Sequence, residues 1–293
     1  MTLRLLSVHA HPDDESSKGA GTLAYYRSRG AEVMVVSCTG GEAGRVLNAS
    51  LDPAARAMAG RDLTGLRRIE MRNAAAVLGI EHRWLGYVDS GWPEDGEPEP
   101  VNSFASIPLD ISAEPLVRVI RSFRPQVLVT YDENGGYPHP DHVRTHEISV
   151  YARDAAADPA RYPDAGPAWR VQKTYYDHIF NAPRIQAIYE VVRVRDPDGE
   201  IVKQMDELRG RFDQPDVTTT HVPVGDFLEV RDRALLSHAS QVSPDSTFFR
   251  WPNELQREIW PTEDFQLADS VVETELPETD LFAGVLDDGV SHD

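Results

Sequence analysis

Residues 3–15 read Leu-Arg-Leu-Leu-Ser-Val-His-Ala-His-Pro-Asp-Asp-Glu, an apolar run that leads directly into histidines and carboxylates. The first six of these residues are too apolar for a strand with one face in water, so they predict a strand covered on both faces. Residues 32–39, Glu-Val-Met-Val-Val-Ser-Cys-Thr, follow the same pattern. Between the two strands we expect a helix that Ser16 or Ser17 caps and that Gly30 ends. Strand, helix and strand in this order predict a right-handed βαβ unit with parallel strands.

Alternating helices and strands continue through the rest of the chain. Further helices are expected over residues 62–78, 112–123, 142–156 and 226–240. Residues 185–211 predict a mostly helical segment that is broken near 196–199. Further strands are expected over residues 82–87, 126–131, 173–180 and 217–224. This alternation predicts an α/β fold whose mostly parallel sheet is covered on both faces.

The composition restricts the partners and the compartment. The chain has 29 Lys plus Arg against 48 Asp plus Glu, and its net charge of −19 repels phosphate backbones and anionic membranes. The single cysteine, Cys38, cannot form an internal disulfide. No stretch approaches the roughly 20 apolar residues that span a bilayer, and the N-terminus lacks the pattern of a signal peptide. We therefore expect a cytoplasmic protein with neither a nucleic-acid nor a membrane partner.

A second histidine-carboxylate cluster, His139-Pro-Asp-His142, follows the predicted strand at 126–131. Both clusters therefore leave a strand at the sheet edge where open α/β sheets bind ligands. Imidazole nitrogens and carboxylate oxygens suit a divalent metal such as zinc, and three protein ligands leave a position for water. His11 and Asp14, three residues apart around a turn, can converge on one ion, with His142 as the third ligand. The two clusters predict a metal-dependent hydrolase.

The neighbours of these ligands suggest the rest of the chemistry. A metal lowers the pKa of its bound water from roughly 15.7 to near 7, and Asp13 is the candidate general base for that water, although it can instead support a ligand. Tyr137 and His139 are placed to stabilise an oxyanion. Asp141 can hydrogen-bond His139 and keep it oriented. His9 is open to two interpretations, a site residue or a buried core histidine.

Other features favour ordinary structural roles when each is taken alone. The glycine-rich loop over residues 40–44 lacks the spacing of a dinucleotide-binding motif, so nucleotide binding is not favoured. Nothing near Cys38 in the sequence lowers its pKa, so this residue is expected to be a small core residue. Lys18, Arg67, Arg68, Asp89 and His238 are by default surface or capping residues.

Residues 9–16, together with residues 131–142 (Tyr-Asp-Glu-Asn-Gly-Gly-Tyr-Pro-His-Pro-Asp-His), resemble the LmbE-like (PIG-L) zinc deacetylase superfamily. Within it, the chain resembles the mycothiol S-conjugate amidases. Further similarities lie at Thr-Gly-Gly-Glu 39–42, Val-Asp-Ser-Gly 88–91, Trp-Pro-Thr-Glu 260–263 and Glu-Thr-Asp-Leu-Phe-Ala-Gly 278–284.

The resemblance implies a Rossmann-like sheet with an added C-terminal α+β part. We accordingly expect a catalytic part over residues 1–180, a C-terminal part over 181–286 that completes the substrate pocket, and a flexible tail over 287–293, the whole forming one integrated domain. The resemblance also implies one Zn²⁺ per chain, with Fe²⁺ as the alternative. The resemblance implies that His11, Asp14 and His142 bind this metal and that Asp13 is the general base. It implies that Tyr137 and His139 stabilise the oxyanion or protonate the leaving amine, and that Asp141 supports His139.

The resemblance further implies residues that contact the substrate. Arg67, in an Arg-x-x-Glu motif with Glu70, and Asp89 are expected to bind sugar or inositol hydroxyls. The lysine at position 18 makes the chain resemble the conjugate amidases more than the sugar deacetylases. Arg45 stands where relatives often carry glutamate, which changes the local charge by two units and leaves the substrate's identity open.

The resulting prediction is an amidase that splits the amide of a mycothiol S-conjugate, a small-molecule thiol conjugate, into glucosaminyl-inositol and a mercapturic acid. Such an enzyme serves detoxification or antibiotic biosynthesis. One alternative is an N-acetylglucosaminyl-inositol or related sugar N-deacetylase. Another is a non-catalytic metal-binding protein. The sequence makes no prediction of the oligomeric state.

Overall fold

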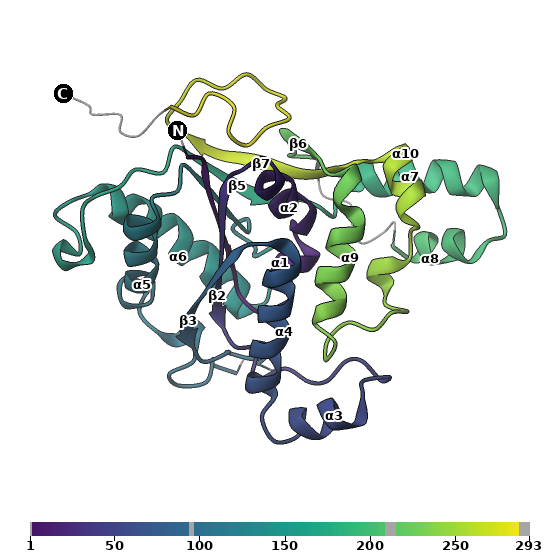
Figure 1. Cartoon of the computed structure of the whole chain (residues 1–293), viewed down its shortest axis with the longest axis horizontal. Helices are drawn as coiled ribbons and strands as arrows, with labels where there is room; N and C mark the ends of the chain where they lie inside the picture. The colour runs from purple at the N-terminus through teal and green to yellow at the C-terminus, as the bar shows by residue number, and fades with distance from the viewer. Residues whose placement is uncertain (1, 94–96, 209–214, 287–293) are drawn as a thin grey trace.

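A mixed sheet of seven strands runs through the part of the chain that the computed structural model describes, residues 2–93, 97–208 and 215–286 (Figure 1). The strand order is β3-β2-β1-β4-β5-β7-β6. The first five of these strands are parallel, while β7 runs antiparallel to both β5 and β6. The strands are β1 (Arg4–His9), β2 (Glu32–Thr39), β3 (Glu81–Tyr87), β4 (Val127–Thr130), β5 (Lys173–Asp177), β6 (Thr220–Pro223) and β7 (Thr262–Ser270). The predicted α/β fold with a mostly parallel sheet is confirmed.

Helices cover both faces of the sheet because its central strands are apolar on both sides. Leu5 of β1 packs into a core with α2, α4 and α9, whereas its neighbour Leu6 packs into a second core with α5 and α6. A third, smaller core joins α7, α8 and α10, which Figure 1 shows at the end of the molecule away from α5. The helices are α1 (Asp14–Ser17), α2 (Ala20–Ser28), α3 (Pro53–Ala59), α4 (Leu63–Leu78), α5 (Leu109–Phe123), α6 (Pro140–Ala157), α7 (Ala182–Arg195), α8 (Glu200–Leu208), α9 (Leu228–Ser237) and α10 (Asn253–Ile259).

The start of α2 differs from the expectation. Ser16 and Ser17 lie inside the short helix α1 and do not cap α2, whose first residues follow Gly19. The free N–H groups of Gly21 and Thr22 instead donate to the Glu263 carboxylate at 3.1 and 2.7 Å. Because the cap comes from β7, more than 240 residues later in the chain, no local pattern could indicate it.

The C-terminal part contributes to the same sheet. β7 pairs with β5, so hydrogen bonds cross the expected boundary at residue 180. The sequence predicted β6 as a strand but did not predict β7, α3 or α10. The expected tail at 287–293 lies outside the described residues. Within the described residues, none of the helices has the length and apolar character that crossing a membrane requires.

Candidate metal centre

The two predicted clusters meet at the carboxyl edge of adjacent strands. β1 and β4 pair in parallel, so the segments that follow them leave the sheet at the same edge. His11 and Asp14 come from the turn after β1, and Asp14 begins α1. His142 lies in the first turn of α6, where Pro140 occupies a position that needs no N–H donor. The fold thus brings together side chains that are about 130 residues apart.

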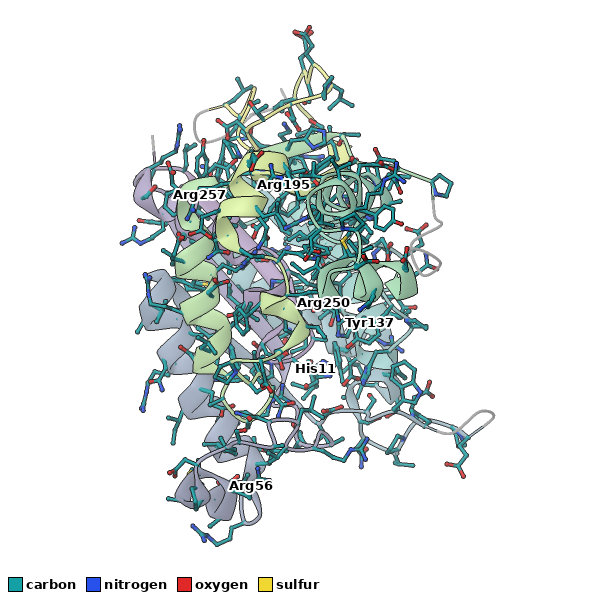
Figure 2. All side chains as sticks on the ribbon, turned by 90° about the vertical axis from the view of Figure 1, so that its right-hand side faces the viewer. His11, Arg56, Tyr137, Arg195, Arg250 and Arg257 are labelled. Atoms are coloured by element: carbon teal, nitrogen blue, oxygen red, sulfur yellow. The ribbon has the colours of Figure 1, made fainter. Side chains whose placement is uncertain are left out.

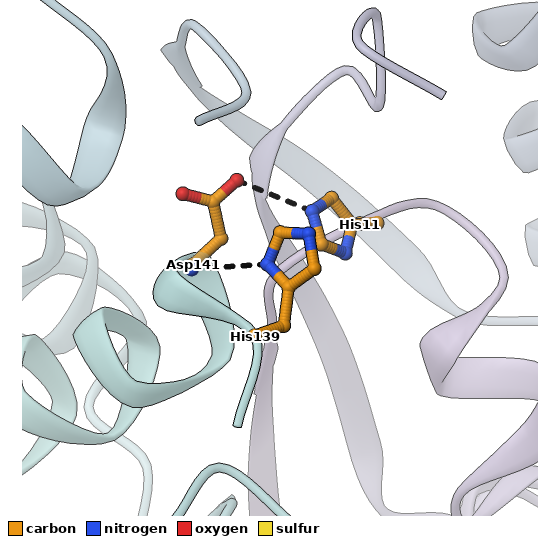
Figure 3. A group of neighbouring side chains, drawn as sticks. All are labelled: His11, His139 and Asp141. Atoms are coloured by element: carbon orange, nitrogen blue, oxygen red, sulfur yellow. Dashed lines mark hydrogen bonds and ion pairs between the residues drawn. The ribbon is translucent and has the colours of Figure 1, made fainter. Parts of the chain in front are cut away.

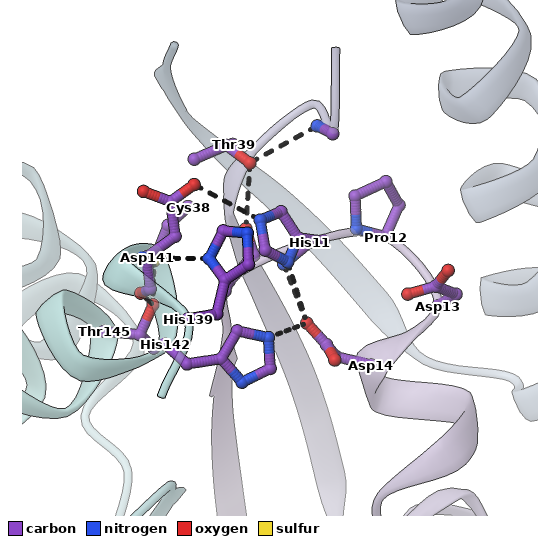
Figure 4. Close-up of polar contacts among 12 residues, drawn as sticks. His11, Pro12, Asp13, Asp14, Cys38, Thr39, His139, Asp141, His142 and Thr145 are labelled. Carbon is purple, nitrogen blue, oxygen red and sulfur yellow. Dashed lines mark hydrogen bonds and ion pairs between the residues drawn. The ribbon is translucent and has the colours of Figure 1, made fainter. Parts of the chain in front are cut away.

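His11, Asp14 and His142 form a buried group that can hold a metal ion. Asp14 Oδ2 lies 3.5 Å from His11 Nδ1 and 3.4 Å from His142 Nε2 (Figure 4). One ligand atom from each residue lies within 4.8 Å of the others. His142 Nδ1 donates to the Gly135 carbonyl at 2.9 Å, which leaves a lone pair on Nε2. That Nε2 is buried and has no hydrogen-bond partner among the described residues, as a metal-binding nitrogen would be.

The approach of Gly135 to His142 explains the glycine at this position. Gly135 has a φ of +73°, and a Cβ there would lie 2.6 Å from the Cβ of His142. Any other residue would therefore be strained and would displace the imidazole. Burial lowers the pKa of His142, which keeps the ring neutral, the form that binds metals.

The carboxylate of Asp141 contacts His11 and not His139. Its Oδ2 lies 3.2 Å from His11 Nε2 (Figure 3). The same oxygen accepts the Ser90 N–H at 3.0 Å. The expected bond from this carboxylate to His139 is absent from the described structure, because His139 Nδ1 accepts the backbone N–H of Asp141 at 3.1 Å. The Asp141 carboxylate accepts the Nε2–H of His11, which leaves the lone pair of His11 on Nδ1, the nitrogen nearer Asp14. This arrangement is typical of metal-binding histidines.

A second group, His11, His139 and Asp141, also has ligand atoms within 4.8 Å of one another. Burial, followed by the neighbouring His11, lowers the pKa of His139 to about 4, so this ring is neutral near pH 7. Its Nδ1 is already engaged with the backbone of α6. The His11, Asp14 and His142 group is the better metal site, because all three of its residues are buried, whereas His139 is only partly buried.

Asp13 lies beside this group and is held by Arg67. Its backbone has a φ of 111°, an uncommon conformation for aspartate that commonly marks functional sites. Arg67 Nη2 donates to Asp13 Oδ2 at 3.1 Å and to the Pro12 carbonyl at 2.6 Å, and Nη1 donates to the Gly41 carbonyl at 2.9 Å. Burial raises the pKa of Asp13, and the Arg67 guanidinium opposes that rise.

The position of Arg67 corrects one expectation. The residue is 4% exposed, so the default surface assignment is wrong. Its Nη atoms bind protein groups, while its Nε has no hydrogen-bond partner among the described residues, so the expected contact with sugar hydroxyls stays a prediction. The contact also explains Gly41, because a Cβ there would lie 1.9 Å from Arg67 Nη1.

Lys18, Tyr137 and Trp92 form one side of the site. Lys18 pairs with Asp14, and although burial favours the neutral amine, Asp14 raises the pKa of Lys18. Its Nζ lies 5.6 Å from the centre of the Tyr137 ring. Tyr137 is 41% exposed and stacks on Trp92 with ring centres 6.3 Å apart. These groups border the metal-binding group from the solvent side and leave the Tyr137 ring accessible to a substrate.

The remaining predicted substrate residues differ in burial. Asp89 is 7% exposed, accepts the Gly91 N–H at 2.7 Å and lies 3.7 Å from His11 Nε2, so it too is wrongly assigned to the surface by default. Burial would raise the pKa of Asp89, but His11 holds it well below its usual range. Arg45 is exposed, and its carbonyl accepts a bond from Gln241 Nε2 at 3.1 Å.

Sequence reasoning missed two buried groups next to the site. His238 is fully buried and contacts Glu15 at 2.8 Å, while Glu15 accepts the Asp13 N–H at 2.9 Å. Asp177, at the end of β5, has an Oδ2 without a partner in the described residues, and burial raises its pKa to about 8. Its position at a strand end was the one available signal. His9 is buried beside Ser7, 2.7 Å from its Oγ, as a core histidine would be.

The fold and site together define an α/β protein with a candidate metal centre at the carboxyl edge of its sheet. Residues 6–153 match the PIG-L family, described as GlcNAc-PI de-N-acetylase. The chain is 50% identical to a mycothiol S-conjugate amidase of Streptomyces coelicolor, across 97% of this chain and 98% of that protein. It is 39% identical to a 1D-myo-inositol 2-acetamido-2-deoxy-alpha-D-glucopyranoside deacetylase of Streptomyces avermitilis, across 96% and 97% of the two chains.

The chain therefore belongs to the PIG-L family. Its relatives are amidases and deacetylases, and it is an amide hydrolase like them. A solved structure, the N,N'-diacetylchitobiose deacetylase from Pyrococcus horikoshii, has the same fold with a TM-score of 0.59 and 20% identity, across 90% of this chain and 83% of that one.

Proposed function

We propose that the protein hydrolyses the amide bond of mycothiol S-conjugates and releases glucosaminyl-inositol and a mercapturic acid. The 50% identity to the Streptomyces coelicolor amidase, which extends along 97% of the chain, is the observation that carries this proposal. The buried His–Asp group beside Asp13 supports it, because such a group suits metal-assisted amide hydrolysis. We place the reaction in the cytoplasm, in keeping with a single, buried and unpaired cysteine, Cys38.

Zinc is the metal that the donor set favours. His11 Nδ1, Asp14 and His142 Nε2 would hold one ion, and nitrogen and carboxylate ligands of this kind suit zinc, with ferrous iron as the alternative. A bound zinc ion would polarise the substrate carbonyl and lower the pKa of water at the site. Asp141 orients His11 for this role through the bond to Nε2.

The chain's own residues provide the acid–base chemistry. Asp13 accepts a proton from the attacking water, and Arg67 fixes the orientation of its carboxylate. The exposed Tyr137 hydroxyl donates to the developing oxyanion. His139, neutral near pH 7, takes up the proton that Asp13 accepts from the water and passes it to the leaving amine. Lys18 and Asp89 lie beside Asp14 and His11, and together with the exposed Arg45 they supply polar contacts to the substrate.

A sugar N-deacetylase is the second candidate, since the deacetylase of Streptomyces avermitilis is 39% identical. A direct comparison separates the two: purified zinc-loaded protein is given a fluorescent mycothiol S-conjugate and N-acetylglucosaminyl-inositol. The proposal expects a higher kcat/KM for the conjugate. Efficient deacetylation with the conjugate left intact would overturn it. Turnover of neither substrate by protein that retains its metal would favour a non-catalytic role.

A further inference from the structure

A cavity of about 350 Å³ lies between the end of α1 and the helices α7, α9 and α10. Its wall is largely apolar and aromatic. The side chains that provide this character are Phe180, Ile185, Leu235, Phe248 and Trp251. A volume of this size is typical of a small-molecule site and exceeds what the water-filled gaps of a packed core offer.

The cavity adjoins the candidate metal centre through α1. Ser17, the last residue of α1, lines the cavity, and its hydroxyl donates to the Asp14 carbonyl at 3.2 Å. Lys18 follows Ser17 and pairs with the Asp14 carboxylate. Figure 2 labels Arg250 of the cavity wall together with Tyr137 and His11 of the metal centre, in a view from the side of the molecule on which α7 and α8 lie. A substrate held at the metal centre can therefore extend past α1 into this cavity.

The polar part of the wall is cationic, although the whole chain carries a net charge of −19. Three arginines, Arg184, Arg231 and Arg250, face one carboxylate, Glu263. Glu263 already accepts two backbone N–H groups of α2. Arg231 pairs with Asp232, which lies outside the wall. The excess positive charge of the cavity comes from Arg184 and Arg250, for which the described residues provide no ion-pair partner.

Two buried donors in this wall lack acceptors. Arg184 is 4% exposed, and its Nη atoms bond to the Ile179 carbonyl and to Gln256 Oε1 at 3.1 and 3.0 Å. Its Nε has no acceptor among the described residues, and neither has Trp251 Nε1. Burial, followed by repulsion from Arg231, lowers the pKa of Arg184 to about 10, so the group remains charged at neutral pH. Buried donors without acceptors are costly, and a bound anionic group would remove that cost.

We propose that this cavity binds the S-linked substituent of the conjugate and that it selects substituents combining an aromatic or aliphatic body with a carboxylate. This inference rests on the proposed function and specifies its substrate. The apolar side chains contact the body of the substituent. Arg250, Arg184 Nε and Trp251 Nε1 donate to the carboxylate. The cavity thereby accounts for the role of α7, α9 and α10 in a family member whose chemistry takes place at β1 and β4.

A matched pair of conjugates tests this selection. Mycothiol carrying an S-(4-carboxybenzyl) group is compared with the neutral S-(4-carbamoylbenzyl) analogue of nearly equal shape. Since hydrogen bonds to charged groups are worth more than neutral ones, we expect wild-type kcat/KM to favour the carboxylate by roughly tenfold or more. Arg250→Gln and Trp251→Phe should each reduce this preference, because each removes a donor to the carboxylate.

Arg195→Gln is the matched control, because Arg195 is exposed at the end of α7 and its ion-pair partner among the described residues is Glu258, which lies outside the cavity wall. It should keep the wild-type preference. Equal kcat/KM for the two conjugates, or a preference that survives both Arg250→Gln and Trp251→Phe, would overturn the inference while the amidase function stands.

Binding of the free product, N-acetyl-S-(4-carboxybenzyl)cysteine, is measured by calorimetry in parallel. If neither conjugate is hydrolysed but this product binds in an Arg250-dependent manner, the cavity assignment holds and the proposed function fails. If neither hydrolysis nor binding occurs, both fail.

Discussion

Arg67 offers a sharp test of how the site is built, because the structure and the family resemblance assign it different tasks. In the structure it holds Asp13 and two turn carbonyls, whereas the resemblance gives it sugar hydroxyls. The variant Arg67→Leu removes the guanidinium and keeps much of the side-chain volume. If Arg67 positions the general base, the loss should affect kcat. If it binds substrate in the ground state, the loss should affect KM.

The structure sets the expected size of both effects. Arg67 donates to the Gly41 carbonyl, the Pro12 carbonyl and Asp13 Oδ2 at 2.9, 2.6 and 3.1 Å. Two buried carbonyls lose a charged donor, and the ion pair counts for less because the Asp13 side chain is 26% exposed. We expect the free energy of unfolding to fall by about 3 kcal/mol. General-base catalysis is worth about 10²–10⁴, so a misoriented Asp13 should lower kcat by roughly 10- to 100-fold.

The assay combines steady-state kinetics with metal analysis of the same samples. Arg67→Leu should keep its metal and its KM while kcat falls. Adding Arg67→Leu to Asp13→Ala should lower kcat no further, since the arginine acts through the missing carboxylate. An increased KM with unchanged kcat, or an additive loss in the double variant, would refute this reasoning and restore the sugar-binding role.

Three further predictions concern the metal, the C-terminal part and pH. Chelation should abolish hydrolysis, and zinc at 100 times its Kd should restore it and raise the free energy of unfolding by about 2.7 kcal/mol; activity that survives complete metal removal would contradict this. Lys173→Met breaks the buried pair of Lys173 Nζ with Glu278 at 2.6 Å and should destabilise the protein by about 3–5 kcal/mol in urea unfolding, with kcat and metal content unchanged. Burial alone would raise the pKa of Glu15, but His238 lowers it from 4.5 to about 2, so the stability from this pair is present above pH 4.5 and is lost as the pH falls toward 2. Metal-free wild type should therefore have a higher Tm than Glu15→Gln, and this difference should shrink as the pH falls from 4.5 toward 2. It should also shrink as the pH rises through the raised pKa of His238. A Tm difference that stays constant with pH would show that the pair does not titrate as described.

The sequence predicts the parts of this site that depend on a strand end and its next few residues. His11 and Asp14 follow one apolar strand, and His142 lies in the first turn of a helix that follows a second apolar strand. Because the two strands are parallel neighbours, the three side chains lie at the same edge of the sheet. The ends of α4 were also predictable, because Asp62 caps the helix and Gly79 ends it in a left-handed conformation. These features depend on neighbours in the sequence.

Contacts between distant segments were not predictable in the same way. The Asp141 carboxylate could have reached either His139 or His11, and only the packing of α6 against the β1 turn decides for His11. His238 has no local motif, and its pairing with Glu15 depends on α9 lying against α1. β7 was missed because its residues alternate weakly between apolar and polar, and its place between β5 and β6 comes from long-range pairing.

The metal content of two neighbouring variants tests the central claim most directly. Asp13→Asn and Asp14→Asn change adjacent carboxylates to amides of the same shape, and metal per chain is measured by mass spectrometry after purification in zinc. The account predicts that Asp13→Asn keeps about one zinc ion per chain with its hydrolysis lost, while Asp14→Asn loses the metal. Metal loss in Asp13→Asn with retention in Asp14→Asn would exchange the two roles, and full retention in both would contradict the ligand set.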